Sequence, residues 1–183
     1  MLDVRGIPAF DDRGLLPPGI HRSTVGELRQ SHLVHGNGAE PWDADWRAYL
    51  LENLARMFTM LRTVGVTSIY VGGSFVEAKA HPSDVDGYFY VADTDAVFDG
   101  RLEASLNTLD PEGAWGWEAD YAVADGAEKR QLRMRDAYGV ELYPVVRKLF
   151  GIVDPSGRLL GFEEGFTVQR RTFRRKGIVQ LID

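Results

Sequence analysis

The sequence predicts an α+β fold in which a mixed β-sheet is flanked by helices within a single domain. A long stretch with helical periodicity, residues 42–64, supplies the main helix. Next comes a strand, a double-glycine turn and a second strand with two aspartates, over residues 67–91. A later apolar strand, residues 139–146, carries one glutamate. We therefore expect residues 1–183 to form one domain, with an arm and short helix over 1–41, a core over 42–146 and an extension over 147–183.

The composition is that of a globular protein, with 44% hydrophobic and 11% aromatic residues among 183. The absence of cysteine excludes disulfides and thiolate metal sites, which leaves carboxylates and four histidines as ligands. The sequence has neither a signal-peptide pattern nor the run of about 18 apolar residues that a membrane span needs, so we expect a cytoplasmic protein with no membrane partner. A net charge of -6 argues against wholesale nucleic-acid binding.

The first 20 residues contain Pro8, Gly14, Pro17, Pro18 and Gly19 and show no helical period, so we expect them to form an extended arm that wraps the core. Thr24 and Glu27 have the spacing of a capping box and predict a short helix over residues 25–31. A glycine-rich loop is expected over residues 32–38. These elements lead into the main helix.

The main helix, residues 42–64, has apolar side chains at steps of three and four residues. Asp43 and Asp45 suit its positive N-terminal end, and Gly65 suits its C-terminal end. We expect the apolar stripe to pack against the sheet rather than to bind a cofactor.

The stretch after this helix favours an anion site. The apolar strand Ser68–Val71 ends at Gly72, Gly73 and Ser74, where a backbone without Cβ atoms can approach a ligand closely. If a helix opens at Ser74 and runs to Lys79, its first N–H groups are unpaired and point at that ligand. We therefore predict that these three turn residues and Lys79 bind phosphate.

Two aspartates begin the second strand, residues 84–91. Alternation places Asp84, Asp86, Tyr88 and Tyr90 on one face, with the two carboxylates rooted roughly 7 Å apart. Their oxygens can converge on a hard cation such as Mg²⁺. Aspartates that follow a turn are also common as turn formers and caps. The order of strand, glycine turn and Asp-x-Asp favours the metal site, and a phosphate cradle beside a metal suggests phosphoryl or nucleotidyl transfer.

Two further helices are expected. The first covers residues 93–109, begins at Asp93 or Thr94 and directs Phe98, Leu102, Leu106 and Leu109 inward. The second covers residues 127–136 and holds Lys129, Arg130, Arg133 and Arg135. These cations either form a solvated face or lie near the phosphates of a nucleotide. No element is predicted for residues 114–126, whose tryptophans are expected in the core rather than stacked on a base.

A turn at residues 154–157 and a strand at residues 178–182 close the chain. Between them, residues 169–176 hold five basic side chains, so the rest of the chain carries a net charge of -11 against -6 for the whole. This segment either contacts RNA or a nucleotide, or neutralises the acidic body.

Gly73-Ser74, a gap of nine residues and then Asp84-Val85-Asp86 resemble the Gly-Ser…Asp-x-Asp signature of the polymerase-beta-like nucleotidyltransferase superfamily. The likeness covers residues 48–146 and is strongest to its small bacterial, minimal and antitoxin-like members. The opening IPAF-DDRGLLPPGIH and the closing KGIVQL resemble the same small bacterial proteins. The resemblance implies a polymerase-beta-type core and a third carboxylate on a later strand, for which Glu141 is the candidate.

The resemblance implies a metal-dependent nucleotidyltransferase. Gly73 and Ser74 would hold the β- and γ-phosphates of a nucleoside triphosphate such as ATP, and Asp84 and Asp86 would bind Mg²⁺ or Mn²⁺. Glu141 would complete a second metal site or take the proton of the attacking hydroxyl. The acceptor would be RNA, a protein or a small molecule, and pyrophosphate would be released.

A binding module is the alternative function. The chain would keep the fold but act as an antitoxin or regulator that masks a partner protein, as in a toxin–antitoxin pair, because little sequence beyond the core is left to hold an acceptor. Metal-dependent nucleotide binding separates the two hypotheses, since an enzyme must retain it. A serine hydrolase is excluded for Ser74, because the Gly-x-Ser-x-Gly context is absent.

Overall fold

A computed structural model describes residues 4–38, 41–117, 132–146 and 149–183 of the chain. Its elements follow one another in this order: β1 (Val4–Arg5), β2 (Ile20–Thr24), α1 (Val25–Gln30), α2 (His32–His35), α3 (Ala44–Thr63), β3 (Ser68–Gly72), the 3₁₀ helix η1 (Gly73–Val76), β4 (Val85–Tyr90), α4 (Asp95–Phe98), α5 (Arg101–Leu109), α6 (Arg133–Tyr138), β5 (Val140–Pro144), β6 (Leu149–Val153), β7 (Leu159–Gly161), α7 (Phe162–Phe166) and β8 (Ile178–Ile182).

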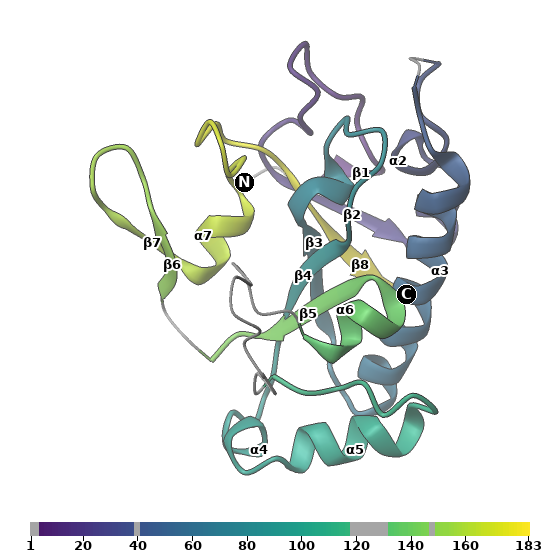
Figure 1. Cartoon of the computed structure of the whole chain (residues 1–183), viewed down its shortest axis with the longest axis vertical. Helices are drawn as coiled ribbons and strands as arrows, with labels where there is room; N and C mark the ends of the chain where they lie inside the picture. The colour runs from purple at the N-terminus through teal and green to yellow at the C-terminus, as the bar shows by residue number, and fades with distance from the viewer. Residues whose placement is uncertain (1–3, 39–40, 118–131, 147–148) are drawn as a thin grey trace, which may run out of the picture.

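Within the described ranges, six strands form one mixed sheet in the order β1-β2-β8-β3-β4-β5. Strands β1, β2 and β8 are parallel, β3 is antiparallel to both β8 and β4, and β5 is parallel to β4. Helix α3 lies along one side of this sheet, whereas α7 and the β6-β7 hairpin lie on the other (Figure 1). The expected single-domain α+β fold with a mixed, helix-flanked sheet is confirmed.

Two strands of this sheet come from outside residues 42–146. Strand β2 belongs to the segment that we expected to form an arm, and β8 comes from the expected extension, yet the two pair with each other over five residues. Strand β8 also pairs with β3, so it lies inside the sheet. Both ends of the chain therefore contribute to the core.

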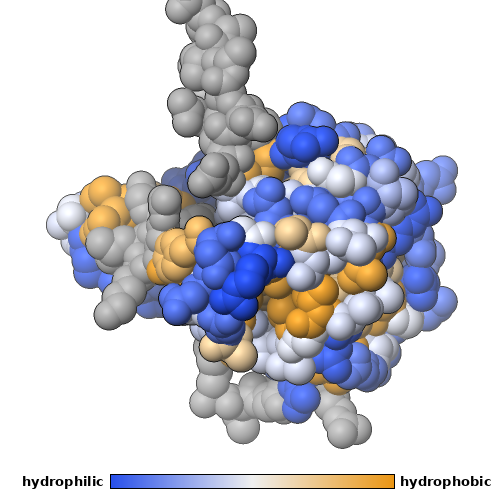
Figure 2. Space-filling view, turned by 90° about the horizontal axis from the view of Figure 1, so that it is seen from below, coloured by the Kyte–Doolittle hydropathy of each residue, from blue (hydrophilic) through white to orange (hydrophobic). Residues whose placement is uncertain are grey.

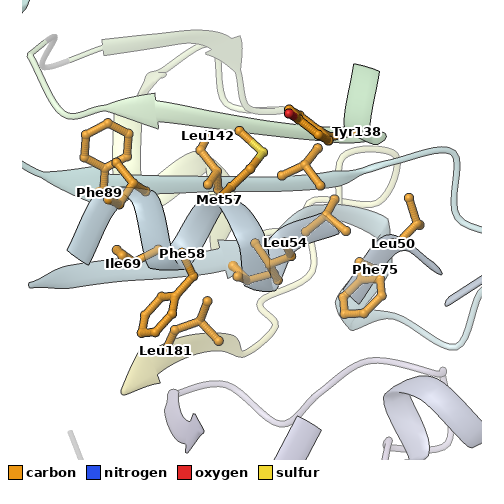
Figure 3. Close-up of a cluster of buried hydrophobic side chains, with 14 of the residues drawn as sticks. Leu50, Leu54, Met57, Phe58, Ile69, Phe75, Phe89, Tyr138, Leu142 and Leu181 are labelled. Atoms are coloured by element: carbon orange, nitrogen blue, oxygen red, sulfur yellow. The ribbon is translucent and has the colours of Figure 1, made fainter. Parts of the chain in front are cut away.

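Helix α3 supplies most of the hydrophobic core. Asp43 caps its start by accepting the N–H of Trp46 at 3.0 Å, and Gly65 follows its end with φ +90°, as the sequence predicted. Its apolar side chains meet inward-pointing side chains of the central strands (Figure 3), among them Leu50, Leu54, Met57 and Phe58 from the helix and Ile69, Phe89, Leu142 and Leu181 from the sheet. The predicted packing of this stripe against the sheet is confirmed.

The opposite face of the sheet is aromatic. Tyr70 and Tyr88 stack with ring centroids 4.9 Å apart, and Tyr88 also contacts Phe162 and Phe166 of α7. Burial raises the pKa of the Tyr88 phenol, which therefore stays neutral at physiological pH. Helix α7 thus covers this face next to the end of β3.

Some predicted local structure differs from what is observed. The capping box of Thr24 and Glu27 is present at the start of α1. Helix α2 occupies the first part of the loop expected over residues 32–38. The Ser31 hydroxyl caps this helix by accepting the N–H of Leu33 at 3.2 Å. Gly36 then ends α2 with φ +73°.

The single helix expected over residues 93–109 is wrong. Gly100 adopts φ +78° and separates α4 from α5, because a left-handed residue cannot continue an α-helix. Leu102 and Leu106 are buried as predicted, but Phe98 is 73% exposed and Leu109 is 41% exposed. Because of this break, α4 does not continue the apolar face of α5, and Phe98 faces solvent.

The side of the molecule that carries α4 and α5 is mostly hydrophilic, with separate hydrophobic areas between the polar ones (Figure 2). Across the part of the chain that the structure describes, every helix is too short or too polar to span a membrane.

Candidate metal centre

Strands β4 and β5 bring three carboxylates together. The strands run parallel with Asp86 opposite Glu141, and Asp84 lies directly before β4, two residues before Asp86. One oxygen from each of Asp84, Asp86 and Glu141 lies within 4.8 Å of the other two. Although β5 is an edge strand, Glu141 is only 1% exposed, and Asp84 is 7% exposed. The predicted convergence of the two aspartates on a third carboxylate is therefore observed.

Polar contacts satisfy part of this cluster. The guanidinium Nε of Arg135 donates to Asp84 Oδ2 at 2.7 Å, and the Ser83 hydroxyl donates to Oδ1 at 3.1 Å. The N–H of Leu132 donates to Glu141 Oε1 at 3.1 Å, but the other oxygen, Oε2, is buried and has no hydrogen-bond partner among the described residues. Buried carboxylate oxygens are normally paired, so this oxygen is open to a cation or a donor that binds from outside.

Gly73 fixes the position of the double-glycine turn against the carboxylates. Its backbone has φ +63°, and a Cβ atom added there would lie 2.2 Å from Asp86 Oδ2. Gly72 pairs with Asp86 across the β3-β4 ladder, and a Cβ atom on it would lie 2.8 Å from the ring of Phe166. Both positions therefore need glycine, for different reasons: a left-handed backbone with close approach at Gly73, and close packing alone at Gly72.

The hydroxyl of Ser74 follows this turn in η1. Its Oγ is buried and, in the described ranges, has no hydrogen-bond partner. A buried hydroxyl without a partner costs free energy, so it is the second polar group here whose bonding capacity is left for a ligand.

The expected helix from Ser74 to Lys79 is wrong. Helix η1 ends at Val76, and Glu77 is already extended and bridges Leu15 of the N-terminal arm. A 3₁₀ turn of four residues does not provide the aligned N–H groups and dipole of an α-helix. The predicted anion site at a helix N-terminus is therefore absent, and a phosphate would meet the glycine turn itself.

Lys79 lies apart from the other predicted phosphate ligands. It is exposed, its N–H donates to the carbonyl of Glu77 and its carbonyl accepts from Arg47. In the described part of the chain, no contact joins its ammonium group to the carboxylates.

Arg47 explains why the helix stops, and sequence reasoning missed it. This fully buried side chain of α3 donates to four backbone carbonyls, those of Leu33, Phe75, Glu77 and Lys79, at 2.6–2.9 Å. Bonds to this guanidinium give the carbonyls of Phe75 and Glu77 a partner other than the i+4 N–H groups of a helix. Burial lowers the pKa of Arg47 to about 10, so it remains charged at neutral pH. The signal in the sequence was a charged residue on the apolar stripe of the main helix.

Lys176 was counted only as part of the basic segment, but it lies beneath the glycine turn. Its ammonium group donates to the Gly73 carbonyl at 2.6 Å and to Glu77 Oε1 at 2.5 Å, and its side chain is 1% exposed. Burial lowers the pKa of Lys176 despite the neighbouring Glu77 and Asp86. The lysine therefore links the segment before β8 to the turn that contacts the carboxylates.

The cations predicted over residues 127–136 are partly placed. Arg135 lies on Asp84, which raises the pKa of the arginine through their hydrogen bond. Arg133 is exposed, and Lys129 and Arg130 lie outside the described residues. Of the tryptophans, Trp115 is 2% exposed in the core, as predicted.

The donor set of this cluster fits a hard divalent cation. Three carboxylates within 4.8 Å repel one another, and Arg135 is the cation that hydrogen-bonds directly to one of them in the described structure. Oxygen ligands of this kind are those that Mg²⁺ and Mn²⁺ prefer. Asp84, Asp86 and Glu141 could thus hold a metal ion, with Glu141 Oε2 as a ready ligand.

Comparison with known proteins places the chain in a family. No curated protein and no solved structure matches it. The profile of a family of unknown function, DUF6932, matches residues 8–182, a range that includes every residue of the carboxylate cluster and the glycine turn. The chain belongs to the DUF6932 family.

Proposed function

We propose that this protein is a metal-dependent nucleotidyltransferase that moves a nucleoside monophosphate from a nucleoside triphosphate to a hydroxyl acceptor and releases pyrophosphate. The observation that carries the proposal is the convergence of Asp84, Asp86 and Glu141 beside a glycine turn that contacts one of them. Carboxylates that hold metal ions next to a phosphate-binding turn are the parts that phosphoryl-transfer chemistry needs, because its catalysis rests on positioning and charge stabilisation.

The three carboxylates would hold Mg²⁺ or Mn²⁺. When bound, such ions neutralise phosphate oxygens and make the acceptor hydroxyl more acidic. Two of the three ligands are nine-tenths buried, so the charges act in a medium where electrostatic interactions are stronger than in water.

The glycine turn would bind the triphosphate tail. Gly73 holds the turn against Asp86, so phosphates bound at the turn would lie beside that metal ligand. The Ser74 hydroxyl has no partner among the described residues, so it would donate its hydrogen bond to a phosphate oxygen. The turn and the carboxylates would thus bring the phosphates to the metal ligands.

Glu141 would either complete a second metal site or take the acceptor's proton. Its Oε2 has no donor in the described structure, whereas Oε1 is fixed by the Leu132 N–H. In the second role, as the acceptor oxygen bonds to the α-phosphorus, the bond from that phosphorus to pyrophosphate breaks and the hydroxyl proton passes to this carboxylate. Arg135 would compete with the metal for Asp84, because its guanidinium donates to Oδ2 of that carboxylate.

Metal and nucleotide binding test the proposal. We expect Mn²⁺ to bind the native protein in a calorimetric titration, and ATP or another triphosphate to bind only with the metal present. The double variant Asp84→Asn, Asp86→Asn should bind Mn²⁺ at least about 100-fold more weakly, because two of three ligands lose their charge. A control, Asp12→Asn, Asp136→Asn, removes two exposed carboxylates and should bind normally. Equal Mn²⁺ affinity in the double variant and the native protein would contradict the proposal.

A further inference from the structure

A tight turn in the basic segment, residues 169–175, presents three exposed arginines. The Gln169 carbonyl accepts the N–H of Phe173 at 2.8 Å, and Val168 bridges Arg175, so both ends of the turn are fixed. The exposed side chains of Arg170, Arg171 and Arg174 have no carboxylate partner in the part of the chain that the structure describes. This arrangement, which we call the basic turn, leaves three guanidinium groups to bind anions.

An aromatic ring lies between these arginines. Phe173 has φ +56°, a left-handed backbone conformation that a bulky residue rarely adopts. The turn's hydrogen bonds hold it there, and its side chain lines a surface pocket of about 390 Å³ together with Leu160, Val168 and Arg158. Strained conformations persist where the surrounding structure fixes them, often at binding sites. Here the strain places a flat apolar ring beside cations.

The basic turn is anchored next to the carboxylate cluster. Gln169 Nε2 donates to Glu77 Oε2 at 3.3 Å, and at the other end Lys176 donates to Glu77 and to the carbonyl of Gly73. Gly73 in turn lies against Asp86. A polynucleotide bound to the basic turn would therefore lie close to the candidate metal centre.

The charge distribution favours a polyanion at this place. Residues 169–176 carry five positive charges, and the rest of the protein carries a net charge of -11. The net negative charge of the rest of the protein would disfavour nucleic acid elsewhere, so the basic turn is the favoured place for a polyanion. An acidic peptide would also meet the arginines, but the pocket that Phe173 lines contains Asp154 and Glu164, which would repel the carboxylates of a peptide. The apolar wall of this pocket suits an uncharged base that stacks on Phe173.

We propose that the basic turn binds single-stranded nucleic acid. Arg170, Arg171 and Arg174 contact successive phosphates, and an unpaired base stacks on Phe173 in the adjoining pocket. The binding does not depend on catalysis, whereas its further role, which is to present a polynucleotide hydroxyl as the acceptor, rests on the proposed function.

Fluorescence anisotropy with labelled single-stranded RNA and DNA oligomers, in EDTA, tests the binding. The triple variant Arg170→Gln, Arg171→Gln, Arg174→Gln should bind at least about 10-fold more weakly. The slope of log affinity against log salt concentration should fall by about 2, because three phosphate contacts to a single strand are lost. As a control of equal charge, Arg13→Gln, Arg56→Gln, Arg133→Gln removes three exposed arginines from other elements and should bind within about twofold of the native protein.

Phe173→Gly separates stacking from folding. Glycine accepts the left-handed backbone, so the variant should stay folded, while the loss of the ring should weaken oligomer binding several-fold. Comparison of the RNA and DNA arms then shows which sugar is preferred. The inference fails if the control triple variant loses as much affinity as the basic-turn variant. It also fails if a polyglutamate peptide or free triphosphate competes as well as the oligomer.

The carboxylate variants keep the two proposals apart. Asp84→Asn, Asp86→Asn should bind the oligomers at least as well as the native protein, because repulsion falls. If the native protein binds an oligomer but never transfers a nucleotide, the proposed function fails and the basic turn remains a binding site. If it transfers a nucleotide to another acceptor without binding any oligomer, the proposed function stands and the basic turn is not a nucleic-acid binding site.

Discussion

Gly73→Ala is a sharp test of how the glycine turn supports the carboxylates. The new methyl group would lie 2.2 Å from Asp86 Oδ2 and 2.8 Å from its Cβ, whereas an ordinary contact is at least 3.4 Å. The Asp86 carboxylate must therefore move by about 1 Å, several times the roughly 0.2 Å that metal–ligand distances tolerate. We expect Mn²⁺ affinity to fall about 10- to 100-fold, as it does when groups that orient a ligand are lost.

The same substitution also strains the backbone, and a second glycine controls for this. Gly113 has φ +56°, close to the +63° of Gly73, but no atom lies within 4 Å of an added Cβ. Both alanine variants should lose about 1–2 kcal/mol of unfolding free energy to the left-handed conformation. Urea denaturation measures this loss, and calorimetry at a temperature where both variants are folded measures Mn²⁺ binding. The reasoning is refuted if Gly73→Ala binds Mn²⁺ as tightly as Gly113→Ala.

Other substitutions test the supporting contacts. Arg47→Met should lower the unfolding free energy by about 3–5 kcal/mol in urea, since four buried carbonyls lose their donor, while the exposed Arg56→Met should stay within about 0.5 kcal/mol. Arg135→Gln should strengthen Mn²⁺ binding several-fold, because it removes a cation that competes with the metal for Asp84. The exposed Arg133→Gln should leave Mn²⁺ affinity unchanged. An unchanged affinity in both variants would refute this competition. A hydrogen bond from an arginine lowers the pKa of Glu164 to about 2, so its stabilising effect is complete above its ordinary value of 4.5 and is lost as pH falls toward 2. The melting temperature of Glu164→Gln should accordingly fall less than that of the native protein over this range.

Local signals in the sequence were enough for the main helix and the two aspartates. The apolar period of α3 and its Asp43 cap are properties of neighbouring residues, as is the capping box at α1. Strand alternation alone places Asp84 and Asp86 on one face. Glu141 was a candidate only because the resemblance implies a third carboxylate on a later strand, and the register of β4 and β5 that places it opposite Asp86 is not a local property of the sequence.

The remaining features depend on contacts between distant segments. Strand β8 pairs with β2 across more than 150 residues, and no local pattern predicts such a pairing. Arg47 ends the helix expected after Ser74 by taking carbonyls that lie about 30 residues away. Gly100 is the exception, since it is a local breaker that was outweighed by the apolar period on either side of it.

Label transfer from α-labelled nucleoside triphosphates tests the central claim most directly. The native protein is incubated with each triphosphate, Mg²⁺ or Mn²⁺ and separate RNA and protein acceptor fractions, beside the Asp84→Asn, Asp86→Asn variant. We predict that label enters an acceptor fraction with the native protein, that pyrophosphate is released in equal amount, and that both signals vanish with the variant. Transfer that persists in a folded variant, or a native protein that binds neither metal nor triphosphate and transfers no label, would contradict the account and favour a module that masks a partner protein.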